Sequence, residues 1–98
     1  MKKKIAILGS TGSIGKTLIE IIKKDKKNFD IILLTAYKNY NEILNQAKIL
    51  NVKNLIITNE KSFQKLKKKK LGNIKIFSNY NSFNNIFKKK IDYVMSSI

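Results

Sequence analysis

The chain has 98 residues and a formal net charge of +15, and it lacks cysteine, histidine and proline. Its length allows a single small domain and excludes a complete two-domain enzyme, and the missing cysteines exclude disulfides and thiol-based metal sites. No apolar run approaches the roughly 20 residues of a membrane span, so we expect a cytoplasmic protein that has no membrane partner.

The positive charge consists entirely of lysine, 21 residues in all. Arginine is the residue that reads guanine edges and binds phosphates through two parallel hydrogen bonds, and the chain has none. Lysine, isoleucine and asparagine (21, 17 and 12 residues) share A/T-rich codons and together form half of the sequence. We therefore attribute the charge to a coding bias on exposed positions and expect no nucleic-acid partner.

Apolar strand patterns alternate with helical patterns along the whole chain. In chain order we expect a strand at Lys4–Leu8, a helix at Ile14–Lys24, a strand at Asp30–Thr35, a helix at Asn41–Leu50, a strand at Asn54–Thr58, a short helix from about Glu60, a strand at Ile74–Phe77, a helical turn or two carrying Phe83, Ile86 and Phe87, and a last strand from Ile91. Such alternation implies right-handed crossovers. The sequence therefore predicts an α/β fold with a Rossmann-like, doubly wound parallel sheet.

The helices are predicted to cover the sheet with apolar stripes at helical spacing. The residues expected to face inward are Ile14, Leu18, Ile21 and Ile22 in the first helix, Ile43, Leu44, Ala47 and Leu50 in the second, and Phe63 and Leu66 in the third. The lysines at 67–70 are typical of a helix C-terminus, where cations suit the helix dipole. Gly72 is then expected to end that helix.

The chain ends at Ser96-Ser97-Ile98, at the carboxyl end of a strand, which is the edge where open α/β sheets bind ligands. A natural domain of this class normally continues into a loop and another helix. We therefore expect residues 1–98 to be a partial N-terminal domain whose sheet is incomplete at its C-terminal end, without the catalytic and C-terminal domains of a complete enzyme.

Glycine stands at every third position of Gly9-Ser10-Thr11-Gly12-Ser13-Ile14-Gly15, directly after a strand and at the start of a helix. Gly9 allows the tight exit from the strand, Gly12 lets a phosphate approach the backbone, and Gly15 lets the helix lie against the strand. Four amides are then expected to bind a dinucleotide pyrophosphate at the positive helix end: those of Thr11, Gly12, Ser13 and Ile14. The hydroxyls of Ser10, Thr11 and Ser13 are expected to add hydrogen bonds. A tight turn without a ligand is the alternative for such a loop.

The end of the second strand favours NADP over NAD. NAD-specific folds usually place an Asp or Glu about 20 residues beyond the glycines, where it binds the ribose 2′-hydroxyl. Residues 35–39 (Thr-Ala-Tyr-Lys-Asn) contain no acid. Lys38 is instead suited to the extra phosphate of NADP, and Tyr37 is placed to stack near the adenine.

The segment from Lys3 to Gly15 closely resembles the amino-terminal signature of the 1-deoxy-D-xylulose 5-phosphate reductoisomerase family. The resemblance continues through Asn28-Phe29-Asp30, through Ala36-Tyr37-Lys38-Asn39, which is similar to the family's Ala-Gly-Lys/Arg-Asn, and through residues 92–98. All 98 positions can be laid along the start of the family, although about residues 55–90 match only loosely. Tyr37 is a departure, because the family usually has glycine there. Ser96 and Ser97 also replace small apolar residues.

The resemblance implies the NADPH-binding part of an enzyme that converts 1-deoxy-D-xylulose 5-phosphate into 2-C-methyl-D-erythritol 4-phosphate in isoprenoid biosynthesis. That reaction combines a rearrangement with reduction by NADPH and uses a divalent metal, Mg or Mn. The substrate is a small phosphorylated sugar, and the full-length enzyme is expected to be a homodimer. The family's cofactor contacts carry over to Thr11, Gly12, Ser13, Ile14, Lys38 and Asn39.

No catalytic or metal-binding residue is expected within the chain. By resemblance, the family's Asn-Lys-Glu segment, metal-binding acids and substrate-phosphate residues lie beyond position 98. The six acids that are present form no metal cluster by their spacing: Glu20, Asp25, Asp30, Glu42, Glu60 and Asp92. We therefore expect the fragment alone to be inactive.

Two other functions fit the same loop. One is another NADP-dependent oxidoreductase, such as a semialdehyde dehydrogenase or a nucleotide-sugar epimerase, although these typically begin Gly-Ala-Thr-Gly rather than Gly-Ser-Thr-Gly. The other is a non-catalytic module that binds NADP without turning it over. A Val-Gly pair just past residue 98, followed by Asn-Lys-Glu, would support the reductoisomerase over another oxidoreductase. The full gene would separate it from a sensor module, which would lack the acidic metal site.

Overall fold

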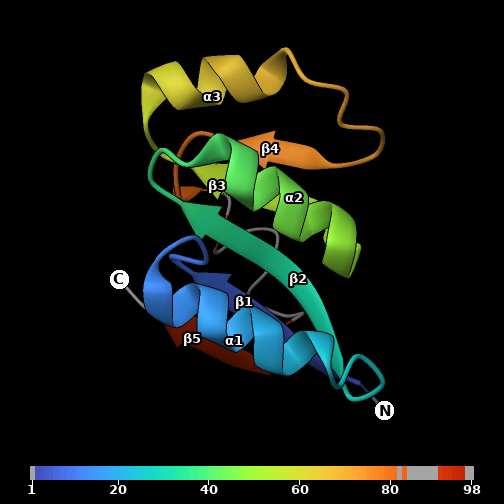
Figure 1. The fold of residues 1–98 in the computed structure, drawn as a ribbon. Helices are drawn as coiled ribbons and strands as arrows, with labels where there is room; N and C mark the ends of the chain where they lie inside the picture. Colours follow the sequence, from blue (N-terminus) through green and yellow to red (C-terminus); the bar gives the residue numbers. More distant parts are fainter. Residues whose placement is uncertain (1, 82, 84–90, 97–98) are drawn as a thin grey trace.

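The computed structural model describes residues 2–81, 83 and 91–96. These residues form five strands and three helices, drawn in Figure 1. The strands are β1 (Lys3–Leu8), β2 (Phe29–Ala36), β3 (Asn54–Ile57), β4 (Lys75–Phe77) and β5 (Tyr93–Ser96). The helices are α1 (Ser13–Lys23), α2 (Tyr40–Leu50) and α3 (Glu60–Lys67). The predicted alternation of strand and helix is therefore confirmed from β1 to β4.

The strands form one parallel sheet in the order β4-β3-β2-β1-β5. From β1 to β4 each new strand is added on the same side of the previous one, with a helix in each connection. The chain then returns to the other side of β1 to add β5. The predicted α/β class with a Rossmann-like parallel sheet is confirmed, and the reversal beside β1 is where such sheets bind ligands.

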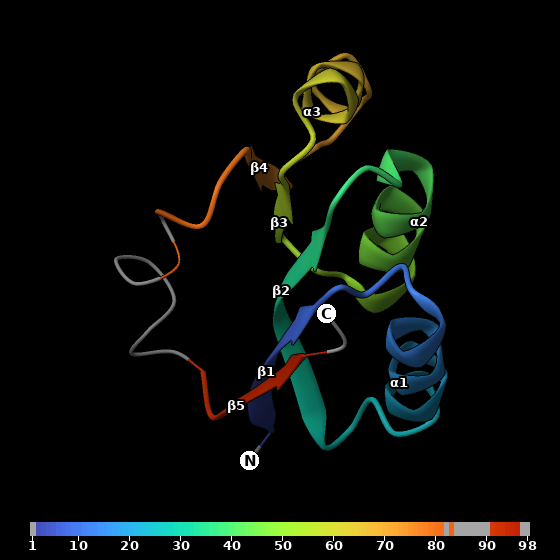
Figure 2. The same cartoon turned by 90° about the vertical axis from the view of Figure 1, so that its left-hand side faces the viewer.

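The main apolar core lies between the sheet and the helices. Figure 2 shows α1 and α2 on one side of the strands. Ile5, Ile7, Leu34 and Leu55 of the sheet are fully buried in this core. The predicted inward residues of α2 are confirmed, because Ile43, Leu44 and Ala47 are buried and Leu50 packs against the same core. The burial of these apolar side chains is the main source of the stability of the domain.

A second, smaller cluster covers the opposite face of the sheet. Its buried members are Ala6, Leu33 and Ile56. The partly buried side chains that pack against it include Phe83 and Ile91, which come from the connection between β4 and β5. Both faces of the central strands are therefore covered, as a parallel sheet requires.

The pairing of β1 with β2 shifts by one residue between Ile5 and Ala6. Ile5 pairs with Ile31 and Ala6 pairs with Leu33, so Ile32 has no partner on β1. Such a bulge bends its strand and interrupts the alternation of side chains. Ile31 accordingly belongs to the core under the helices, whereas both Ile32 and Leu33 belong to the cluster on the other face.

The predicted inward stripe of α1 was wrong at two of its four positions. Ile14 is 63% exposed and Ile21 is 58% exposed, so both lie on the outer side of the helix. The side that faces the core consists of Gly15, Leu18, Ile19 and Ile22. The reason is that Gly15 has no side chain and lies directly against the loop before the helix, which fixes the rotation of α1.

Two element boundaries also differ from the prediction. The helix α3 ends at Lys67, and Gly72 has a φ of 59° in the loop beyond it rather than at the helix end. The strand β5 begins at Tyr93 and not at Ile91. The expected helical residues Ile86 and Phe87 lie outside the described residues. Among the helices that the structure describes, none is long and apolar enough to cross a membrane.

Candidate functional site

The loop between β1 and α1 turns sharply at Gly9. Its φ is 77°, in the left-handed region that residues with a side chain rarely adopt. The amides of Gly9 and Ser10 both donate to the carbonyl oxygen of Thr35 at the end of β2, at 3.0 and 2.9 Å. The predicted role of Gly9 as the tight exit from the strand is confirmed.

Gly15 holds the first turn of α1 against this loop. A Cβ atom built on Gly15 would lie 2.6 Å from the Cα of Ser10 and would also overlap the carbonyl oxygen of Gly9. Ordinary carbon contacts are about 3.5 to 4.0 Å, so no residue with a side chain fits here unless the helix moves away. The predicted role of Gly15 in helix packing is confirmed.

Gly12 is different, because nothing in the fold requires a glycine there. Its backbone is extended, with φ −75° and ψ 173°. A Cβ atom at this position would meet a single neighbour, the carbonyl oxygen of Gly9, at 3.8 Å. The space beside Gly12 is therefore open, and the atoms of a ligand can approach the backbone of the loop there.

The N-terminus of α1 presents unpaired amides beside this open space. Gly12 is the N-cap residue, and no side chain caps the helix. The amides of Thr11, Ser13 and Ile14 have no acceptor among the described residues. The first turn of α1 carries no acid. Unpaired amides and the positive end of the helix dipole together attract an anion such as a phosphate.

Two buried polar residues that the sequence reasoning missed anchor the loop. Thr35 is fully buried, and its Oγ1 accepts a hydrogen bond from the amide of Gly9 at 3.0 Å. Gln46 of α2 is also buried, and its Nε2 donates to the carbonyl oxygen of Ser10 at 2.9 Å. Each is a polar residue within an apolar strand or helix face, which is the signal that marks such anchors.

The structure corrects the role predicted for the hydroxyl of Ser10. Ser10 is fully buried, so its side chain is not available to a ligand on the surface of the loop. Neither Ser10 Oγ nor Gln46 Oε1 has a hydrogen-bond partner in the part of the chain that the structure describes. Thr11 and Ser13 remain accessible.

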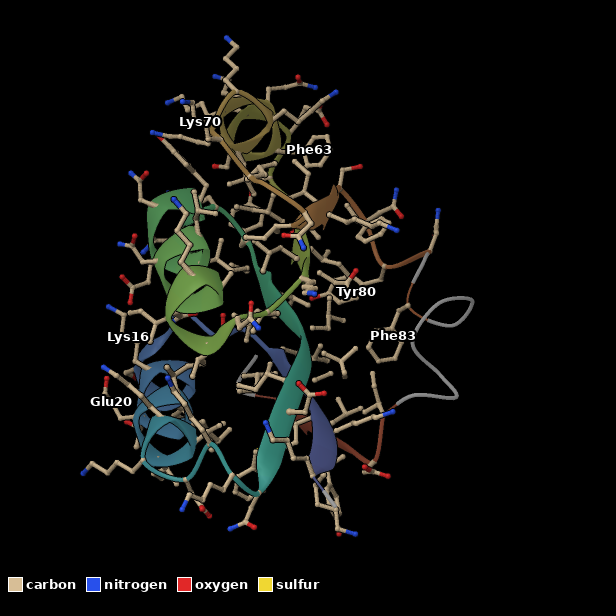
Figure 3. The ribbon with its side chains drawn as sticks, turned by 90° about the vertical axis from the view of Figure 1, so that its right-hand side faces the viewer. Lys16, Glu20, Phe63, Lys70, Tyr80 and Phe83 are labelled. Atoms are coloured by element: carbon tan, nitrogen blue, oxygen red, sulfur yellow. The ribbon has the colours of Figure 1, made fainter. Side chains whose placement is uncertain are left out.

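A cleft of about 420 Å³ opens beside the loop, at the carboxyl ends of β1, β2 and β3. Of the predicted site residues, Thr11 and Gly12 line this cleft. The other lining residues are Gly9, Thr35, Ala36, Tyr37, Thr58 and Tyr80. Tyr80 was not predicted, and Figure 3 shows it on the side of the sheet away from α1 and α2.

Lys38 and Asn39 lie in the exposed turn between β2 and α2, next to Tyr37 but outside the lining of the cleft. The Lys38 ammonium has no partner among the described residues. Asn39 is the N-cap of α2, and its Oδ1 accepts a hydrogen bond from the amide of Glu42 at 3.3 Å. Capping is therefore one role of Asn39 that needs no ligand.

Within the described residues, no three acidic side chains gather into a group that could hold a metal ion. The corner formed by the loop and the cleft has room for an anion on the backbone amides and for a flat or apolar group beside Ala36 and Tyr37.

The family model of 1-deoxy-D-xylulose 5-phosphate reductoisomerase matches residues 5–98 of the chain. A curated protein of that name from Pelagibacter ubique (strain HTCC1062) is 52% identical over 99 aligned positions, which cover 98% of this chain and 26% of the relative. Another from Thermoanaerobacter sp. (strain X514) is 33% identical over 96 positions, covering 98% of this chain and 25% of the relative. The chain thus spans about a quarter of the length of these relatives.

Solved structures with a similar fold include enzymes of the same name. A 1-deoxy-D-xylulose 5-phosphate reductoisomerase from Zymomonas mobilis in complex with NADPH has a TM-score of 0.73 and 27% identity, covering 78% of this chain and 20% of that one. A DOX-P reductoisomerase in complex with NADPH, fosmidomycin and magnesium has a TM-score of 0.85 over 98% of this chain and 24% of that one. Its identity is 24%, so it supports the fold alone.

Proposed function

Because this chain belongs to the 1-deoxy-D-xylulose 5-phosphate reductoisomerase family, we propose that it forms the NADPH-binding part of such an enzyme. The observation that carries the proposal is Gly12. The fold has no need of a glycine there, yet the missing side chain leaves the amides at the start of α1 open to an approaching phosphate. This geometry suits the pyrophosphate of a dinucleotide.

The pyrophosphate would be held by the unpaired amides of Thr11, Ser13 and Ile14. The amide of Gly12, which was also predicted to bind it, donates to the carbonyl oxygen of Gly9 at 3.4 Å, so it would join them only by giving up this long bond. The adenosine half would lie along the end of β2, because dinucleotides cross such sheets beside the strand that follows the glycine loop. Lys38 and Asn39 are then the residues nearest to a 2′-phosphate, and the ammonium of Lys38 would pair with it. When bound, NADPH supplies a hydride, and the residues of this chain hold and orient it.

Tyr37 stands where the family usually has glycine, and the structure is compatible with that change. The carbonyl oxygen of Tyr37 accepts a hydrogen bond from the amide of Asn59 at 2.9 Å, so the backbone stays tied to the end of β3. The side chain is 64% exposed and lines the cleft. We infer that it adds a wall to the adenosine site instead of blocking it.

We propose further that the complete enzyme converts 1-deoxy-D-xylulose 5-phosphate into 2-C-methyl-D-erythritol 4-phosphate in isoprenoid biosynthesis. The name that the matching family and its curated relatives carry supports a small phosphorylated sugar as the substrate, and the family resemblance implies a divalent metal, Mg or Mn. The catalytic and metal-binding residues would come from the part of the enzyme outside this chain, so residues 1–98 alone would form a partial domain without activity. We also propose a homodimer in the cytoplasm.

An NMR titration of the ¹⁵N-labelled chain with NADPH tests the binding site. We expect the amide signals of residues 9–15 to move, with weak affinity because the chain spans only about a quarter of its relatives. Gly12→Val should lose this response, because its side chain would occupy the phosphate site. Ile21→Val is the matched control, since Ile21 is exposed on the same helix and lies outside the loop.

Two results would contradict the proposal. One is a Gly12→Val variant that binds NADPH as the parent does while its spectrum shows an intact fold. The other is a parent chain in which NADPH moves signals elsewhere but leaves residues 9–15 unchanged.

A further inference from the structure

Tyr80 links the segment after β4 to the glycine loop. Its hydroxyl donates a hydrogen bond to Thr35 Oγ1 at 2.9 Å, across 45 positions of sequence. The same oxygen accepts the amide of Gly9 at 3.0 Å. Thr35 is fully buried, so this bond holds the phenol ring of Tyr80 at a fixed place beside the loop. Buried or half-buried tyrosines commonly fix their ring through the hydroxyl in this way.

The ring of Tyr80 is not itself buried. Tyr80 is 38% exposed and lines the same cleft as Thr11, Gly12 and Tyr37. Figure 3 shows it beside the strands, on the side of the sheet that the helices leave uncovered. A fixed aromatic face next to an open cleft can bind a flat ligand at a small cost in conformational entropy.

The position of Tyr80 relative to Gly12 decides which part of a dinucleotide would meet it. With the pyrophosphate on the amides beside Gly12, the adenosine half extends toward the end of β2. Ala36 and Tyr37 line the cleft at that end, and Tyr80 lines the same cleft. Purine bases stack readily on aromatic side chains, because every base has a π-face.

We propose that Tyr80 is a binding residue for the adenosine half of the cofactor, with its ring forming part of the adenine site and its hydroxyl setting the position of that ring through Thr35. This inference rests on the proposed NADPH-binding function. It assigns to Tyr80, just after β4, a part in cofactor binding that neither the glycine loop nor the turn at Lys38 supplies.

The test separates the two halves of the cofactor. The ¹⁵N-labelled chain is titrated with adenosine 2′,5′-bisphosphate and, separately, with reduced nicotinamide mononucleotide. Tyr80→Leu removes the aromatic face and keeps an apolar side chain, whereas Tyr80→Phe keeps the face and removes the bond to Thr35. Tyr93→Leu is the matched control, because Tyr93 lies on β5, is 53% exposed and does not line the cleft.

We expect Tyr80→Leu to weaken adenosine 2′,5′-bisphosphate roughly tenfold, the loss of one base–aromatic stack. Its affinity for the mononucleotide should stay within about twofold of the parent, and Tyr93→Leu should match the parent for both ligands. Tyr80→Phe should keep most of the affinity for the bisphosphate. Its Gly9 amide signal should move, because Thr35 Oγ1 loses one of its two partners.

Two outcomes overturn the inference and leave the proposed function intact. In one, Tyr80→Leu binds the bisphosphate as well as the parent does while Gly12→Val loses NADPH. In the other, Tyr80→Leu weakens both half-ligands equally, which is the result that a purely structural role predicts. If the parent and Gly12→Val respond identically to NADPH, the proposed function fails and the role of Tyr80 fails with it.

Discussion

The contrast between Gly12 and Gly15 can be tested by adding one methyl group at each position. In Gly15→Ala the new Cβ would lie 2.6 Å from Ser10 Cα and 2.7 Å from the carbonyl carbon of Ser10. Both neighbours are backbone atoms and cannot rotate away, so α1 would have to retreat by about 1 Å to restore ordinary contact. That movement would also disturb the helix face that carries Ile19 and Ile22 into the core.

The cost can be estimated from known effects of overpacking. Forcing extra atoms into a packed region typically costs about 1 to 3 kcal/mol, and the absence of flexible neighbours favours the upper end. Alanine in place of glycine within a helix returns at most about 1 kcal/mol. We therefore expect Gly15→Ala to lower the free energy of unfolding by about 2 kcal/mol. For a domain of this size that corresponds to a fall in Tm of roughly 10 °C.

Gly12→Ala is the matched control, because its Cβ would meet one atom at an ordinary 3.8 Å. The change restricts the unfolded chain, which stabilises by about 0.4 to 1 kcal/mol. Alanine is a poorer N-cap than glycine, which offsets this gain. Thermal and urea unfolding followed by far-UV circular dichroism measure both variants. If Gly15→Ala melts at or above the temperature of the parent with the same spectrum, the close contact between α1 and the loop is refuted.

Three further predictions concern single side chains around the loop. Lys38→Ala should weaken the affinity for NADPH by about two- to fivefold, as expected for one exposed charge pair, and leave the affinity for NADH unchanged. Equal losses for both cofactors in a binding titration would show that Lys38 does not bind the 2′-phosphate. Asn39→Asp should keep the cap of α2 and hence the Tm, because aspartate caps as well as asparagine does. Its negative charge should nevertheless reduce the preference for NADPH over NADH, and an unchanged preference would place the 2′-phosphate away from this turn. Gln46→Met keeps the length of the side chain and leaves the Ser10 carbonyl oxygen unpaired, but it also removes the buried and unpaired Oε1. Because the second effect offsets part of the first, urea unfolding should show a loss of about 1 kcal/mol; an unchanged midpoint would mean that the bond to Ser10 adds no net stability.

The features that could be predicted from the sequence are local ones. Apolar runs between turns place the strands, and the spacing of Gly9, Gly12 and Gly15 defines the corner between β1 and α1. Each depends on residues close together in the chain, whose backbone requirements follow from the residue types alone. The alternation also predicts a parallel sheet with right-handed crossovers, although it leaves the order of the strands open.

The features that could not be predicted depend on contacts between distant segments. The rotation of α1 is set by the contact of Gly15 with Ser10, and a helical stripe of isoleucines gives no sign of it. The hydrogen bond from Tyr80 to Thr35 joins residues 45 positions apart, and nothing in the sequence around either residue indicates that the two meet. Gln46 reaches Ser10 across 36 positions. A polar residue inside an apolar pattern, such as Thr35, indicates that a contact of this kind exists. It does not indicate which residue is the partner.

The bulge at Ile32 in the pairing of β1 with β2 determines which way Thr35 points. Downstream of Ile32, side chains of β2 at odd positions face away from the helices, as Leu33 does, while Leu34 and Ala36 face them. Upstream, Ile31 faces the helices although its number is odd. A β2 strand in regular phase from its first residue would turn the Thr35 hydroxyl into the apolar core, out of reach of Tyr80. A single inserted residue, about 10 Å away along the strand, therefore selects the side of the sheet on which Thr35 can meet Tyr80.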